Sequence, residues 1–184
     1  GTAFAWSTLT ITIQGTNDAP VAVADTGTLA KGSVTSASGN VLANDTDVDA
    51  GDTKTVSLAG TTTANTAVTA GSNSANGLTV GGTYGVLTIG ADGTYAYALA
   101  TASDATRYSA LRALTAGVSA TETFNYQVKD ANGATSTTTL TFTITGANEP
   151  PVNSYPASVT TSSGAVSFTS TNTISVSDLD GNLS

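Results

Sequence analysis

The chain has 184 residues, with 13 acidic and 5 basic side chains and a formal net charge of −8. It contains no Cys, His or Met, which excludes zinc sites built from Cys or His, thiol chemistry and any His-based catalytic triad. The acidic excess argues against a nucleic-acid partner, which needs clustered Lys and Arg, and no stretch approaches the 18 apolar residues of a membrane span.

Thr, Ser, Gly, Ala and Val dominate the sequence, a composition typical of sheets and turns. Apolar residues alternate with polar ones over short runs, which predicts strands with one buried face. In chain order these strands are expected at 20–25, 33–38, 54–58, 78–80, 85–89, 94–99, 121–129 and 135–146. Asp92-Gly93 predicts a tight hairpin, and Tyr108, Leu111 and Leu114 are spaced as on a short helix. The pattern predicts an all-β, Greek-key sandwich with one short helix.

An internal repeat with a spacing of 131 residues divides the chain. Leu9-Thr-Ile-Thr-Ile-Gln-Gly-Thr-Asn-Asp-Ala-Pro-Val21 aligns with Leu140-Thr-Phe-Thr-Ile-Thr-Gly-Ala-Asn-Glu-Pro-Pro-Val152. Asp47-Val-Asp49 aligns with Asp178-Leu-Asp180 at the same spacing. We therefore expect tandem domains, with residues 1–16 as the closing strand of a preceding unit, 17–148 as one complete unit, and 149–184 as the linker and first strands of a following unit.

A cluster of carboxylates follows the second expected strand, at Asp45, Asp47, Asp49 and Asp52. Alternating carboxylates in one loop repel one another unless a cation neutralises them, and calcium accepts six to eight oxygen ligands in irregular geometry. The loop is no EF-hand, because Ala50 and Val56 stand where that motif requires Gly and Glu. Further ligands are expected from the linker residues Asn17 and Asp18.

The repeat predicts a second calcium site built in the same way, from Asn148, Glu149, Asp178 and Asp180. The alternative interpretation is a pair of solvated acidic turns that bind no specific ion. Its main weakness is that the Asn-acid-x-Pro linker and the Asp-x-Asp pair occur twice at one offset. Asp25 and Asp130 are further acidic residues that could serve as ligands or as ordinary turn and strand-end residues.

Four motifs in this order resemble the VCBS-type repeat of giant bacterial adhesins. They are Thr12-Ile-Gln-Gly-Thr-Asn-Asp-Ala-Pro-Val21, Asn40-Val-Leu-Ala-Asn-Asp-Thr-Asp-Val-Asp49, Tyr84-Gly-Val-Leu-Thr-Ile-Gly-Ala-Asp-Gly-Thr-Tyr95 and Phe124-Asn-Tyr-Gln-Val128. The resemblance covers about residues 8–152, and the residues after Pro151 depart from it. It implies a cadherin-like extender or adhesion module, exported by type I secretion to the cell surface, with calcium at the junctions between neighbouring repeats. The adhesion target stays open.

Two other functions compete with a structural repeat. A module that binds sugar or protein would need exposed aromatic side chains, and the candidates are Trp6, Tyr84, Tyr95, Tyr97, Tyr108, Tyr126 and Tyr155. An aspartic-protease interpretation depends on Asp25-Thr-Gly27, but that chemistry needs two such Asp residues and no second copy occurs. We therefore expect no enzyme. A Lys–Asn or Lys–Asp isopeptide crosslink is a further possibility, with Lys31, Lys54 and Lys129 as its candidates.

Overall fold

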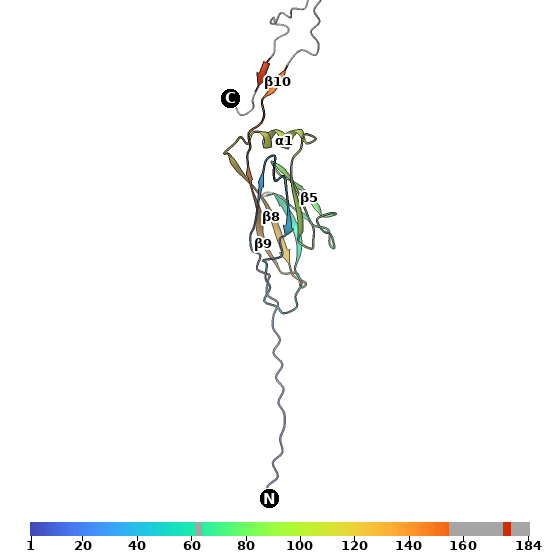
Figure 1. Ribbon diagram of the computed structural model, residues 1–184. Coiled ribbons are helices and arrows are strands. Elements are labelled where there is room, and N and C mark those ends of the chain that lie inside the picture. The colour runs from blue at the N-terminus through green and yellow to red at the C-terminus, as the bar shows by residue number, and fades with distance from the viewer. Residues whose placement is uncertain (62–63, 155–174, 178–184) are drawn as a thin grey trace, which may run out of the picture.

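Two β-sheets pack face to face in the computed structural model, and one short helix lies across an end of the sandwich (Figure 1). The structure describes residues 1–61, 64–154 and 175–177. The prediction of an all-β sandwich with a single short helix is confirmed within these residues.

The first sheet has five strands in the spatial order β1 (Asp25–Ala30), β9 (Thr135–Thr145), β8 (Ser119–Lys129), β3 (Thr55–Thr61) and β4 (Ala64–Ala67). β1 runs parallel to β9, and the other neighbours are antiparallel. The parallel pair means that the chain enters this sheet at one end of the sandwich and leaves it at the other.

The second sheet has four antiparallel strands in the order β2 (Ser36–Asn40), β7 (Thr94–Leu99), β6 (Gly85–Ile89) and β5 (Leu78–Gly81). The β6–β7 hairpin matches its prediction to the residue. The tight turn between these strands requires a positive φ at Gly93, and its value of +82° causes little strain because glycine has no Cβ atom.

The helix α1 (Ala105–Arg112) closes the end of the sandwich between β7 and β8. It begins where the side chain of Asp104 accepts a hydrogen bond from the backbone N–H of Arg107, an N-cap that satisfies one otherwise unpaired donor. Leu111 and Leu114 are buried beneath it, as their spacing predicts.

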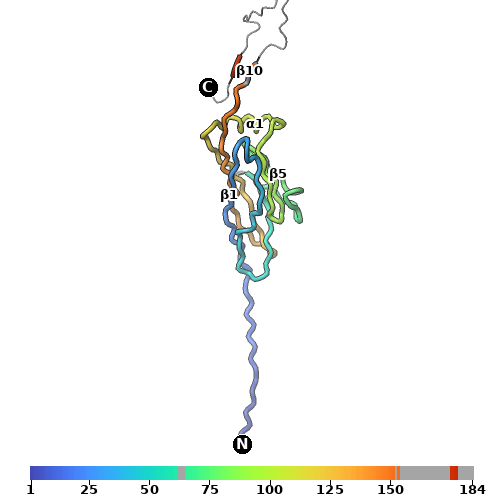
Figure 2. Tube along the Cα trace, in the orientation of Figure 1, coloured from blue at the N-terminus to red at the C-terminus, as the bar shows by residue number. Residues whose placement is uncertain are grey.

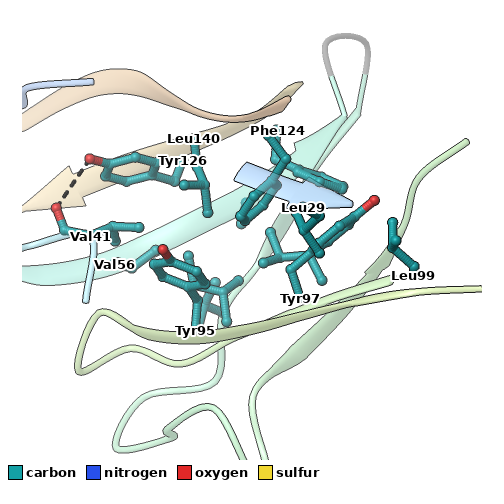
Figure 3. Close-up of a cluster of buried hydrophobic side chains, with 14 of the residues drawn as sticks. Leu29, Val41, Val56, Tyr95, Tyr97, Leu99, Phe124, Tyr126 and Leu140 are labelled. Atoms are coloured by element: carbon teal, nitrogen blue, oxygen red, sulfur yellow. Dashed lines mark hydrogen bonds between the residues drawn. The ribbon is translucent and has the colours of Figure 1, made fainter. Parts of the chain in front are cut away.

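The core between the sheets is built from aromatic rings and branched aliphatic side chains (Figure 3). The rings of Tyr97 and Phe142 stack with centroids 4.3 Å apart, and Phe124 meets Tyr97 edge-on at 5.8 Å. These three side chains are at most 1% exposed, and such ring pairs add about 1 kcal/mol each beyond their buried area. The core therefore holds the two sheets, and with them the loops at both ends, in a fixed relation.

The first strand lies later in the chain than predicted. The alternation at Val21 and Val23 indicated a strand at 20–25, but these side chains are 58% and 43% exposed and only Val21 forms a bridge, to Thr46. β1 instead begins at Asp25 and includes Gly27, where a Cβ atom would lie 2.7 Å from the ring of Phe142. The glycine leaves room for the large ring beside the backbone of β1.

Beyond α1, the short strands β10 (Val152–Ser154) and β11 (Ser175–Ser177) form an antiparallel pair (Figure 1). Their register joins Val152 to Ser177, and the bridge from Val21 to Thr46 joins residues whose numbers are both 131 lower. The backbone pairing therefore recurs at the spacing of the sequence repeat.

Residues 1–19 leave the opposite end of the sandwich as an exposed chain, and within the described part of the protein they pair with no sheet (Figure 2). Trp6, Leu9, Ile11 and Ile13 are each at least 74% exposed there. That this segment closes a preceding unit stays a prediction. No helix among the described residues is long and apolar enough to cross a membrane.

Candidate metal centre

Three segments meet at the end of the sandwich opposite α1. They are the incoming chain before β1, the loop between β2 and β3, and the turn between β8 and β9. One carboxylate oxygen from each of Asp47, Asp52 and Asp130 lies within 4.8 Å of the others. Because Asp130 is 78 residues from Asp52 in the sequence, only the folded sandwich brings them together.

The linker residue Asn17 reaches into this cluster. Its side-chain N–H donates to Asp130 Oδ2 at 2.7 Å, and its Oδ1 accepts a bond from Asn132 at 2.6 Å. Asn132 also donates to Asp52 Oδ2 at 3.1 Å. The Asn17 amide thus binds the incoming chain to the turn between β8 and β9, and the Asn132 amide joins that turn to the loop between β2 and β3.

The Asp-x-Asp pair shapes the rest of the loop. Asp47 Oδ1 accepts a bond from the backbone N–H of Asp49 at 2.9 Å, and Asp49 Oδ2 accepts one from the backbone N–H of Asp18 at 2.8 Å. The second oxygen of Asp47 is buried and, among the described residues, has no hydrogen-bond partner. A buried carboxylate oxygen without a donor is costly, which points to a missing positive group.

Among the described residues, no Lys or Arg side chain forms an ion pair with the cluster. The ion pairs among the described residues use Asp104 and Glu149 as their acids, and neither lies at this end. Hydrogen bonds from the Asn17 side chain and from backbone N–H groups, including those of Gly133 and Ala134, hold the pKa of Asp130 below its ordinary value. Asp130 is therefore a carboxylate at neutral pH and adds its negative charge to the cluster.

Calcium fits this donor set on chemical grounds. It binds oxygen ligands at about 2.3–2.6 Å, so two oxygens on one ion lie up to about 5 Å apart. The three carboxylates meet that condition. A hollow of about 550 Å³ beside them, lined by residues that include Asn17, Asp49 and Asp52, leaves room for further oxygen ligands.

Asp45 belongs to a deeper group than the other predicted ligands. It is 6% exposed, its Oδ1 accepts a bond from the backbone N–H of Val23 at 2.7 Å, and its Oδ2 has no partner among the described residues. Burial raises its pKa, and the nearby charge of Asp25 raises it further. Asp45 is therefore buried where the incoming chain crosses the sandwich, and it is not one of the three carboxylates that converge.

Asp25, the residue of the protease-like motif, is the first residue of β1. Its Oδ2 accepts a bond from the Tyr126 hydroxyl at 2.7 Å, and burial raises its pKa above the ordinary 3.8. Its surroundings are those of a strand-end residue that fixes a buried tyrosine.

Asp25→Asn is expected to stabilise the calcium-free protein at neutral pH by up to about 1 kcal/mol, the range for a partly solvated charge. Because the folded pKa is raised, the stability linked to Asp25 is fully present below pH 3.8 and is lost as the pH rises through the folded pKa. Asparagine stays neutral and still accepts from Tyr126. Urea unfolding in chelator across this pH range should therefore show the two proteins converging in acid.

Asp104→Asn is the control, for which the opposite change in stability at neutral pH is expected. Hydrogen bonds from Arg107 lower the pKa of Asp104, so this change should reduce stability at neutral pH, and the loss should vanish in acid as the wild-type carboxylate becomes protonated. A destabilised Asp25→Asn protein at neutral pH would contradict the first expectation.

Asn148 and Glu149, half of the second predicted site, lie at the α1 end. Glu149 forms ion pairs there with Lys31 and Arg112. Asp178 and Asp180 lie outside the described residues, so that site stays a prediction.

The sequence did not single out Asn132, which joins the linker to the loop, and it left Asp130 open. Asp130-Ala-Asn-Gly133 indicates a turn in which Asp130 could be a ligand, but nothing in this segment of the sequence shows that it faces the acidic loop. Three of the seven candidate aromatics, Tyr95, Tyr97 and Tyr126, belong to the core and are at most 9% exposed. Tyr84 and Tyr108 are half-buried against it, Trp6 is exposed, and Tyr155 lies outside the described residues.

Comparison with known proteins matches the architecture described above. The family model for the bacterial cadherin-like domain matches residues 17–146, which run from the linker asparagine to the end of β9. No curated protein matches the chain. Since the match spans more than half of the chain and includes the sandwich and its acidic end, the protein belongs to the bacterial cadherin-like domain family.

Proposed function

We propose that this chain is an extender repeat of a large bacterial surface adhesin, secreted by the type I route, and that calcium stiffens the junctions between its repeats. The observation that carries the proposal is that carboxylates from two loops converge and that one of them, Asp130, is hydrogen-bonded to the linker residue Asn17. An ion held by these groups would tie the incoming chain to the sandwich. The resemblance to VCBS-type repeats and membership of the cadherin-like family support the adhesin context.

Asp47, Asp52 and Asp130 would hold the ion, and Asn17 and Asp49 are within reach of the same hollow. Calcium would supply the positive charge that the partnerless Asp47 oxygen lacks. Bringing the carboxylates together without it costs repulsion, so the ion and the folded junction stabilise each other. The consequence is a joint whose stiffness depends on calcium.

Thermal unfolding of the full chain with calcium and with chelator tests this proposal. At a calcium concentration of 100 times Kd, binding to the folded state alone adds about 2.7 kcal/mol, which corresponds to a rise in Tm on the order of 10 °C for a domain of this size. Amide exchange at residues 15–20 should slow at the same calcium concentrations, because the linker becomes fixed.

Magnesium is the matched ion for comparison, because its preference for six ligands in octahedral geometry suits an irregular loop poorly. A protein whose Tm and linker exchange respond to neither ion would sink the proposal. An equal response to both ions would show general charge screening in place of a calcium site.

A further inference from the structure

The outgoing linker is anchored to the sandwich by an ion cluster at the α1 end. Lys31 Nζ lies 3.1 Å from Glu149 Oε1, and Arg112 Nε lies 3.7 Å from Glu149 Oε2. Each carboxylate oxygen thus faces a different cation. Lys31 Nζ also donates to the backbone carbonyl of Arg112 at 3.2 Å, which joins the end of the helix to the same group.

Burial makes this cluster more than a surface contact. The side chain of Lys31 is 8% exposed and that of Glu149 is 19% exposed. Exposed ion pairs contribute little, but removing one partner of a buried pair leaves an uncompensated charge and is strongly destabilising. The backbone N–H of Lys31 donates a hydrogen bond to the backbone carbonyl of Thr145 at the end of β9. The lysine is therefore held where the chain leaves the sheet.

Asp18 occupies the same place in the incoming linker, 131 residues before Glu149. Its backbone N–H binds Asp49 of the sandwich that follows it. Its carboxylate, in contrast, has no hydrogen-bond or ion-pair partner among the described residues. The neighbouring Asn17 is bound by Asp130 and Asn132, which also belong to the following sandwich.

We propose that each linker is bound in two directions, its asparagine by the unit that follows and its acid by a Lys–Arg pair on the unit that precedes. Glu149 shows the backward contact within this chain. The carboxylate of Asp18 then takes the same contact from a preceding unit of the same fold, at that unit's α1 end. This inference rests on the proposed tandem function and adds to it a contact that needs no metal.

The charges at the two ends of the sandwich favour this head-to-tail arrangement. Three of the five basic residues, Lys31, Arg107 and Arg112, lie at the α1 end. The opposite end carries the other two, Lys54 and Lys129, but there they are outnumbered by the carboxylates of Asp45, Asp47, Asp49, Asp52 and Asp130. Complementary charges on facing ends set orientation and register between partners, so a second unit placed end to end brings cations toward the linker acid.

Hydrogen exchange of the full chain in chelator tests the backward contact. Lys31→Met and Glu149→Gln are each expected to speed amide exchange at residues 147–154 by about tenfold or more, because the linker loses its anchor. The double variant should be no faster than either single one, since both remove one interaction. Lys129→Met, which removes a cation at the other end, is the control and should leave this exchange unchanged.

Asp18→Asn tests whether the linker acid binds the unit that precedes it or the metal site of the unit that follows. In this chain it should change neither the stability in chelator nor the calcium affinity measured by calorimetry, because Asp18 is exposed and is not one of the three carboxylates that converge. An affinity lowered tenfold by this change would overturn the assignment, since it would place the acid on the forward metal site. Unchanged exchange at residues 147–154 in both Lys31→Met and Glu149→Gln would overturn the backward contact.

The experiments test the proposed calcium site and the proposed backward contact of the linker acid independently of each other. Lys31→Met should bind calcium like the wild type, because a lysine is no calcium ligand and Lys31 lies at the end of the sandwich away from Asp47, Asp52 and Asp130. A wild-type chain that binds no calcium would remove the proposed stiffening by metal, while the exchange results would still decide whether the linker acid is anchored backward. Circular dichroism establishes that each variant is folded before it is compared.

Discussion

Asp47→Asn is expected to weaken calcium binding at least about tenfold, or 1.4 kcal/mol, while raising the Tm of the calcium-free protein. The calcium effect follows because the variant loses one of three converging carboxylates, and charge count governs calcium affinity. The calcium-free effect follows from the buried, partnerless oxygen of Asp47. An amide N–H at that position can donate to Asp52 or Asp130.

The backbone around the substituted residue should stay in place. The side-chain oxygen of the introduced asparagine still accepts the bond that Asp47 Oδ1 accepts from the N–H of Asp49. Relief of one repulsive carboxylate and gain of one hydrogen bond together are worth about 1–2 kcal/mol, or a rise of several degrees in Tm. The predicted signature is therefore a variant that is more stable without calcium and less responsive to it.

Calorimetric titration and thermal unfolding, with and without calcium, measure both effects. Asp104→Asn removes the same charge at the α1 end and should leave calcium affinity unchanged. If Asp47→Asn kept the wild-type affinity, the ion would have to be held elsewhere. A lower Tm in chelator would mean that the Asp47 carboxylate is stabilised by its surroundings as they stand.

Glu122→Ala is expected to reduce stability by on the order of 3 kcal/mol or more, without changing calcium affinity. Glu122 lies on β8, is 6% exposed, and accepts bonds from the backbone N–H groups of Thr83 and Tyr84 and from the Tyr97 hydroxyl. It therefore joins the first sheet to the second across the core. Removing the carboxylate leaves three donors unpaired, each of which costs about 1–3 kcal/mol when buried.

Glu122→Gln is the matched variant, because its amide keeps an acceptor for the two N–H groups and can donate to the tyrosine oxygen. It should retain most of the stability that alanine loses. Burial, followed by the bond to Glu122, raises the pKa of Tyr97, so the tyrosine stays a donor throughout the neutral range. Urea unfolding gives the comparison, and equal stability of the alanine and wild-type proteins would show that the carboxylate contributes nothing to the fold.

The sequence predicted best what local chemistry determines. The hairpin of β6 and β7 follows from Asp92-Gly93, because that turn lets two alternating runs pair. The first strand was misplaced because Val21 and Val23 alternate like strand residues, whereas the sheet selects the Gly27 segment that fits against Phe142. That choice depends on a ring 115 residues away.

The candidate site likewise combines residues that local motifs predict with residues that only the folded chain brings close. The Asp-x-Asp loop and Asn17 were predicted from their own motifs, but the approach of Asp130 and the bridge through Asn132 arise from the pairing of β3 with β8. For Glu122 the sequence does carry a signal. This residue alternates in register with the buried Phe124 and Tyr126, and so it belongs to the core face of its strand.

The parallel pair of β1 and β9 determines how the domain bears a pulling force. Six residue pairs, from Asp25 with Leu140 to Ala30 with Thr145, join the strand that follows the incoming linker to the strand that precedes the outgoing one. Tension between the two linkers pulls β1 from its first residue and β9 from its last, so the strands slide against each other. Their hydrogen bonds are then loaded together in shear and cannot be peeled apart one at a time. The topology thus resists extension along the line between the two linkers whether or not calcium is bound.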